Sequence, residues 1–131
     1  MKPHIVRLTY GMDLRKGIED YCLDRKVFSG YIASCAGCLK HAKIRLAGAK
    51  DYLDEEEDYE IVSLSGTVAG NGVHIHIALA DETGRALGGH LAYGCIVNST
   101  AEIVIVETEE YDLTREFDPE TGYRELTIHK T

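Results

Sequence analysis

The stretch from Val73 to Leu91 reads VHIHIALADETGRALGGHL, and its pattern predicts a β-hairpin. Apolar residues alternate with His74 and His76 in its first half, which is the period of a half-buried strand. Asp81 to Arg85 then fits a three-residue hairpin loop, in which Asp81 opens a type I turn and Gly84 takes the left-handed position. The residues after the loop would return as the second strand.

This loop length also predicts where the third histidine of the stretch lies. If Asp81 pairs with Arg85, His90 falls directly opposite His76, with Cβ atoms roughly 5 Å apart. His74 shares the face of His76, because side chains two apart on a strand emerge on the same side. A loop one residue longer or shorter would turn His90 to the other face, and a bulge at Gly88-Gly89 would disturb the register.

Three imidazoles that converge on a rigid sheet are ligands that Zn²⁺ takes at a site with an open fourth position. Ligand type alone leaves other divalent metals open. A His-x-His pair on a strand also occurs as an ordinary polar face or as two hydrogen-bonded core histidines, so both alternatives stand. His4, His41 and His129 lack matching partners in the sequence, and we expect them to be structural.

The rest of the chain predicts one helix and about seven strands. Asp13 is a good N-cap, and Leu14, Ile18, Tyr21 and Cys22 fall on one face of a helix over about residues 13–26. Strand patterns follow near residues 5–10, 31–38, 42–46, 59–69, 73–80, 101–108 and 123–129, with a further edge near 113–117. Short turns join most of them and no linker divides the chain. We therefore expect a single α+β domain over residues 1–131, built on a mostly antiparallel sheet.

Composition bounds the class of protein. A chain of 131 residues with 44% hydrophobic content is the size and make-up of one globular domain. It has no apolar run long enough for a membrane helix and no secretory signal at Met1-Lys2-Pro3, so a cytoplasmic protein is expected. The net charge is −8, and the acid-rich segment 51–60, which we expect to be a solvated loop, carries much of it. Such a charge argues against nucleic acid as a partner, because duplex binding depends on Lys and Arg that neutralise phosphates.

The four cysteines predict no zinc or redox site. Cys35-Ala36-Gly37-Cys38 is a C-x-x-C motif, but no second pair follows it, and it lies in a β-like run rather than at the start of a helix. Together with Cys22 and Cys95, these residues are expected to be reduced thiols buried in the fold.

Five blocks of sequence carry a resemblance to a known family. They are VHIHI at 73–77, Gly84-Arg85-x-x-Gly88-Gly89-His90-Leu91 with Gly94, TAEI at 100–103, EIVSLSG at 60–66, and Arg115-x-x-Asp118-x-x-x-Gly122. In these blocks the chain resembles the prokaryotic form of the plants-and-prokaryotes conserved domain, a family often labelled as DNA-binding. The resemblance implies a compact α+β homotrimer in which His74, His76 and His90 bind zinc.

Plant members of that family carry an AT-hook beside the domain and use the block that matches residues 60–66 to contact other proteins. This chain shows no basic arm, and Glu57-Asp58-Tyr59 stands where the plant domains carry Gly-Arg-Phe. Both differences argue against a DNA-binding or plant-type partner role here.

Three functions remain open from the sequence. The first is a small trimeric metal-binding protein. The second is a zinc-dependent enzyme that acts on a small molecule bound near the metal, with Glu102 as a candidate proton carrier and Arg85 as a candidate anion clamp. Each of these two residues also has an ordinary role, Glu102 as a hydrogen-bond acceptor beside a ligand and Arg85 as a solvent-facing charge near a turn. The third is DNA binding, which would require a basic face.

Overall fold

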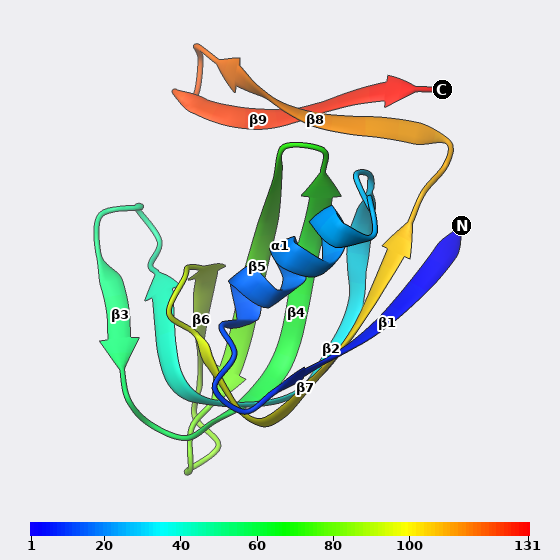
Figure 1. The fold of residues 1–131 in the computed structure, drawn as a ribbon. Coiled ribbons are helices and arrows are strands. Elements are labelled where there is room, and N and C mark those ends of the chain that lie inside the picture. The colour runs from blue at the N-terminus through cyan, green and yellow to red at the C-terminus, as the bar shows by residue number, and fades with distance from the viewer.

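A computed structural model describes residues 1–131 and contains one helix and nine strands (Figure 1). Every strand pairing in it is antiparallel. In chain order the elements are β1 (Lys2–Thr9), α1 (Leu14–Asp24), β2 (Gly30–Arg45), β3 (Tyr52–Glu55), β4 (Tyr59–Ala69), β5 (Gly72–Ala80), β6 (Ala86–Leu91), β7 (Ile96–Glu107), β8 (Tyr111–Asp118) and β9 (Tyr123–Lys130). The α+β class and the antiparallel sheet predicted from the sequence are confirmed.

The main sheet has seven strands and curls back on itself. Its order is β1-β7-β2-β4-β5-β6, with β3 paired to β2. The long strand β2 pairs with β4 and β7 along its first part, and with β3 and β6 at its end, where Arg45 lies opposite His90. The pairing of β6, the edge strand, with β2, in the middle of the sheet, closes this part of the sheet. It also brings residues from β2 beside the hairpin of β5 and β6.

Helix α1 lies in the hollow of the curled sheet, in front of β4 and β5 (Figure 1). Asp13 caps it by accepting a hydrogen bond from the backbone of Lys16 at 2.9 Å, and Leu14, Ile18 and Cys22 are buried against the sheet, as predicted. The helix ends at Asp24 rather than near residue 26. Lys26 takes a left-handed φ of 56°, which stops the helix.

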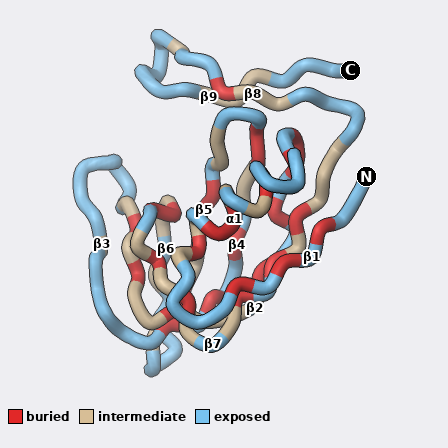
Figure 2. The backbone as a smooth tube through the Cα atoms, in the orientation of Figure 1, coloured by how far each residue is buried: buried red, intermediate tan, exposed pale blue.

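The core explains which face of the hairpin is free. It contains 24 buried residues, which α1 and the main sheet contribute together with Val27 and Cys95 from the connections between them. Figure 2 shows the buried segments gathered inside the curl. On β5, Ile75, Ile77 and Leu79 point into the core, so that His74 and His76 emerge on the exposed face.

Three details of the strand prediction were wrong. Strand β2 is continuous from Gly30 to Arg45 instead of two strands, because it bends through register shifts and keeps pairing on both sides. The acidic segment is only partly a loop, since Tyr52–Glu55 forms β3 at the edge of the sheet, where charged side chains remain in solvent. The segment near residue 113 does not extend the main sheet but pairs with β9 in a separate two-stranded sheet.

The β8–β9 hairpin lies over the turn between β4 and β5 (Figure 1). Arg115 is its one buried residue. The Arg115 backbone N–H donates to Asn71 Oδ1 at 2.7 Å, and the Arg115 carbonyl accepts from Asn71 Nδ2 at 2.9 Å. Leu113 adds a bond from its N–H to Ser29 Oγ at 2.9 Å. The hairpin is therefore held to the body of the protein at this point of its first strand.

The one helix of the chain is too short to cross a membrane.

Candidate metal centre

The turn between β5 and β6 has the predicted geometry. The Asp81 N–H donates to the Arg85 carbonyl at 3.0 Å, and the Gly84 N–H donates to the Asp81 carbonyl at 2.9 Å. Gly84 has a φ of +83°, the left-handed conformation that glycine adopts without strain. The Asp81 carboxylate accepts bonds from the backbone of Thr83 and Arg85, which fixes the loop from within.

The register that follows from this turn is also confirmed. His76 lies opposite His90, and no shift interrupts the pairing through Gly88 and Gly89. A Cβ atom at Gly88 would lie 2.3 Å from the carbonyl oxygen of Ile77, and one at Gly89 would lie 2.6 Å from that of Arg45. The two glycines therefore permit β6 to pass close to β5 on one side and β2 on the other, which a bulge would have prevented.

The three histidines converge on the outer face of this hairpin. Their ring centroids are 4.9 Å apart for His74 and His76, 5.3 Å for His74 and His90, and 5.7 Å for His76 and His90. The Nε2 atoms of His74 and His76 are 3.1 Å apart. One nitrogen from each ring can be chosen so that all three lie within 4.8 Å of one another.

The surroundings favour the neutral form of His74 and His90. Partial burial, followed by the positive charge of Arg45, lowers the pKa of His90 to about 4. Partial burial, followed by the neighbouring His76, lowers the pKa of His74. The Nδ1 atom of His90 is buried without a hydrogen-bond partner. Neutral imidazole is the form that ligates a metal.

The structure does not bring the other two candidate residues to the histidines. Arg85 is exposed in the turn, five residues from His90, or about 16 Å at a strand rise of roughly 3.3 Å per residue. Glu102 is exposed on β7, opposite Arg7 and Ala36, and β2 and β4 separate its strand from β5 in the sheet. The carboxylate of Glu102 accepts a bond from the Thr100 hydroxyl at 3.4 Å. Neither residue is placed to act on a ligand at the histidines.

Three other arginines lie beside the histidines. A cavity of about 330 Å³ opens next to His74 and His90. Its lining residues are Arg45, Val73, His74, His90, Arg115, Tyr123, Arg124 and Glu125. A second hollow, which His76 also lines, shares Arg45, His90 and Tyr123 with it. The sequence analysis missed these arginines, because they come from β2, β8 and β9 and meet only through long-range contacts; the block around Arg115 was the one signal.

A sequence model of the Plants and Prokaryotes Conserved (PCC) domain matches residues 1–109. The chain belongs to the PCC domain family. The match includes all three histidines and ends before the β8–β9 hairpin. The chain is 42% identical over 131 residues to the bifunctional protein GlmU of Synechococcus sp. strain JA-3-3Ab, a match that covers 99% of this chain and 21% of that protein. It thus spans about a fifth of the length of the curated relatives it matches.

Solved structures share the fold of this PCC domain. A hypothetical protein from Salmonella cholerae-suis has a TM-score of 0.94 and 31% identity, over 98% of this chain and 94% of that one. A candidate DNA-binding protein from Bacteroides thetaiotaomicron has a TM-score of 0.86 and 25% identity, over 95% and 91% of the two chains. A protein from Archaeoglobus fulgidus described as metal-containing has a TM-score of 0.80 and 28% identity, over 97% and 94%.

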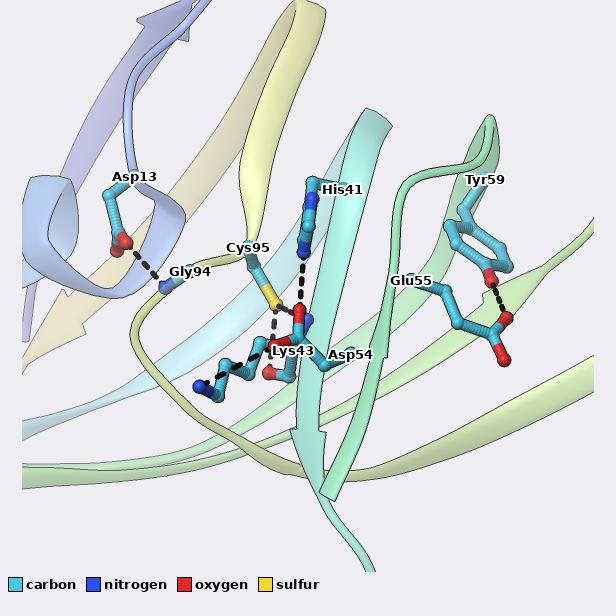
Figure 3. A network of polar contacts seen from close by, with 8 residues as sticks. All are labelled: Asp13, His41, Lys43, Asp54, Glu55, Tyr59, Gly94 and Cys95. Carbon is cyan, nitrogen blue, oxygen red and sulfur yellow. Dashed lines mark hydrogen bonds and ion pairs between the residues drawn. The ribbon is translucent and has the colours of Figure 1, made fainter.

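The remaining histidines of the PCC domain lie apart from the cluster. His41 pairs with the carboxylate of Asp54 at 2.5 Å, which also receives Lys43 at 3.6 Å (Figure 3). His4 is buried, with Nε2 2.8 Å from the Glu107 carboxylate. These pairs hold strands together, as β2 to β3 and β1 to β7. His129 is exposed on β9.

The four cysteines are free, and three are buried. Burial raises the pKa of Cys22 to about 11, of Cys35 to about 12 and of Cys95 to about 11. Such thiols are poor nucleophiles and poor metal ligands at neutral pH. The C-x-x-C motif lies within β2, as the sequence analysis predicted.

Proposed function

We propose that this PCC domain binds one divalent metal ion, zinc, through His74, His76 and His90. The observation that carries the proposal is the convergence of three ring nitrogens within 4.8 Å of one another on one rigid hairpin. Zinc holds imidazole nitrogens at about 2.0–2.1 Å, so two ligands of a tetrahedral site lie about 3.4 Å apart. The 3.1 Å between the Nε2 atoms of His74 and His76 is close to that spacing.

Two further observations support a metal at this position. The His90 Nδ1 atom is buried and unpartnered, which is costly unless something outside the chain satisfies it. The lowered pKa values of His74 and His90 favour the neutral rings that a metal needs. The structurally similar protein of Archaeoglobus fulgidus is described as metal-containing, at 28% identity. A zinc ion with three histidine ligands would supply a Lewis acid with one open position.

Metal analysis tests the proposal. Purified protein is dialysed against zinc and then against buffer without it, and its zinc content is measured by inductively coupled plasma mass spectrometry. We expect about one zinc per chain, lost in His76→Ala and kept in the matched control His129→Ala, which removes an exposed histidine of β9. Equal zinc content in the two variants would refute the assignment.

We also propose that the protein forms the homotrimer expected from its family resemblance. Large apolar side chains are exposed on several strands, with Ile5 79% exposed, Val62 60% and Ile128 61%, and an interface between subunits would bury such side chains. Native mass spectrometry measures the assembly directly. If His76→Ala loses zinc and remains a trimer, the metal does not hold the subunits together, whereas dissociation to monomers would give the metal a structural role.

A zinc-dependent enzyme is the second candidate, because the cavity beside the histidines could admit a small molecule. Glu102, to which proton transfer was first assigned, lies on β7 away from the histidines. The one acid that lines the cavity is Glu125, and no hydrogen bond joins it to a histidine of the cluster, so we propose no reaction. For DNA binding, the family label and the Bacteroides relative speak in favour, and the net charge of −8 speaks against. Salt-dependent binding of the protein to duplex DNA at physiological ionic strength would favour that third candidate.

A further inference from the structure

We propose that the cavity beside the histidines binds a small dianionic molecule, one that carries a phosphate group or two carboxylates, through Arg45, Arg115 and Arg124. The inference rests on the proposed metal function in one respect: the anion would lie next to the ion and could also occupy its open position. The arginines themselves would attract the anion with or without metal.

The charge of the cavity is opposite to that of the protein. Three arginines line it against one acid, Glu125, which leaves an excess of two positive charges before any metal is counted. The chain as a whole carries a net charge of −8. None of the three arginines belongs to an ion pair of the protein, all of which involve other basic groups. An excess of two charges without carboxylate partners matches a dianion.

Arg115 provides the most specific observation. Its side chain is only 9% exposed, and its Nε atom is buried with no hydrogen-bond partner. One other guanidinium nitrogen, Nη2, donates to the Thr67 hydroxyl at 2.7 Å. Burial of a guanidinium without a counter-ion is unfavourable, and an oxyanion that accepts two parallel N–H bonds is its best partner. The unsatisfied Nε of Arg115 is therefore where we expect an anion to bind.

The arginines are held in position by the fold. The Arg115 backbone is fixed on both sides by Asn71, and the Arg124 Nη2 atom donates to the Arg115 carbonyl at 3.1 Å. Arg45 is placed opposite His90 by the pairing of β2 with β6. Residues of the β8–β9 hairpin therefore line one side of the cavity, and residues of β2, β5 and β6 line the other. In Figure 1 the hairpin lies over the start of β5.

A competing explanation is that Arg115 only anchors the hairpin through Thr67. That explanation accounts for Nη2 but not for the unpartnered Nε of Arg115. It also does not account for two further arginines, Arg45 and Arg124, that line the same cavity without a carboxylate partner. Arg124 is exposed, so its removal threatens the fold least. It therefore offers the cleaner variant.

Equilibrium dialysis with radiolabelled inorganic phosphate and with radiolabelled succinate tests the proposal. The full chain is measured in metal-free and zinc-loaded form, without free zinc and at constant ionic strength. We expect saturable binding of one anion per chain, weakened about 10-fold or more in Arg124→Gln and in Arg115→Met, because a charge-assisted hydrogen bond is lost. Arg7→Gln is the matched control and should bind as the unmodified protein does. Circular dichroism shows whether Arg115→Met is folded.

Each outcome decides the proposal. Tighter binding of phosphate identifies a phosphate site and tighter binding of succinate a dicarboxylate site, and both support it. No saturable binding of either anion, or binding that Arg124→Gln leaves unchanged, overturns it. Arginine-dependent binding of duplex DNA without saturable binding of either small anion also overturns it. Zinc content is measured separately. Absence of anion binding in protein that keeps its zinc would refute the anion site and not the metal site. Anion binding in protein that takes up no zinc would refute the metal site and not the anion site.

Discussion

Gly88 offers a way to disturb the histidine cluster without touching a histidine. A methyl group at this position would lie 2.3 Å from the Ile77 carbonyl oxygen and 3.1 Å from the Ala78 Cα. Both contacts are with backbone, so no side chain can move aside. An ordinary contact requires about 1 Å more, and in Gly88→Ala the strands β5 and β6 must separate by about that distance.

This displacement sets the size of two effects of Gly88→Ala, the loss of stability and the loss of zinc affinity. Overpacking of this kind costs about 1–3 kcal/mol in the free energy of unfolding, which at this chain length lowers the melting temperature by roughly 4–12 °C. Metal sites require ligand distances within about 0.2 Å of ideal, so a shift of about 1 Å between His76 and His90 should weaken zinc binding at least 10-fold.

The control is Gly11→Ala, which lies between β1 and α1. A methyl group there meets nothing within 4 Å, but the φ of +86° makes the substitution unfavourable by about 1–2 kcal/mol. The two variants should therefore lose similar stability by thermal unfolding, while zinc affinity, measured by competition with a chromophoric chelator, falls only in Gly88→Ala. If Gly88→Ala binds zinc as tightly as the unmodified protein, the close approach of β5 and β6 does not position the histidines.

Three other predictions follow from contacts described above. Asp13→Ala should lower the free energy of unfolding by about 1–2 kcal/mol in urea titrations, because the carboxylate caps α1 and also accepts the Gly94 N–H at 2.6 Å; a change no larger than that of exposed Asp24→Ala would contradict this. Iodoacetamide at pH 8 should modify Cys38 well before the three buried cysteines, whose pKa values are raised by burial, and peptide mass spectrometry that finds Cys22, Cys35 or Cys95 alkylated first would refute it. Metal-free protein should lose stability as the pH falls from 6.5 towards 4. In that range the unfolded chain protonates His90, whereas the folded chain, in which the pKa of His90 is about 4, does not. His90→Gln should flatten this part of the curve of unfolding free energy against pH, and an unchanged slope would show that His90 does not cause it.

The β5–β6 hairpin that carries the three histidines could be predicted from sequence because its determinants are local. Asp81 and Gly84 fix the loop, the loop fixes the register, and the register places His90 opposite His76. The same holds for α1, whose cap and apolar face lie within a dozen residues of each other. In both cases a short stretch of sequence contains all the information needed.

The grouping of Arg45, Arg115 and Arg124 around the cavity could not be predicted, because it depends on contacts between distant segments. Arg45 reaches His90 only because β2 bends and pairs with β6, and Arg115 reaches the cavity only because Asn71 holds the β8–β9 hairpin over β5. Periodicity does not report such pairings. For the same reason Glu102, which is near the histidine block in sequence, lies on a strand that the sheet order places elsewhere.

The β8–β9 hairpin separates two proposed roles of the site, metal binding and anion binding, onto different parts of the fold. The three histidines proposed to bind metal lie on strands of the main sheet, which also build the core. Two of the three arginines lie instead on the β8–β9 hairpin, which has a single buried residue. If both proposals hold, replacement of the β8–β9 hairpin alone would change which molecules the cavity accepts and leave the histidine site unchanged. The domain thus combines a fixed histidine site in the main sheet with a separate hairpin that can change without it.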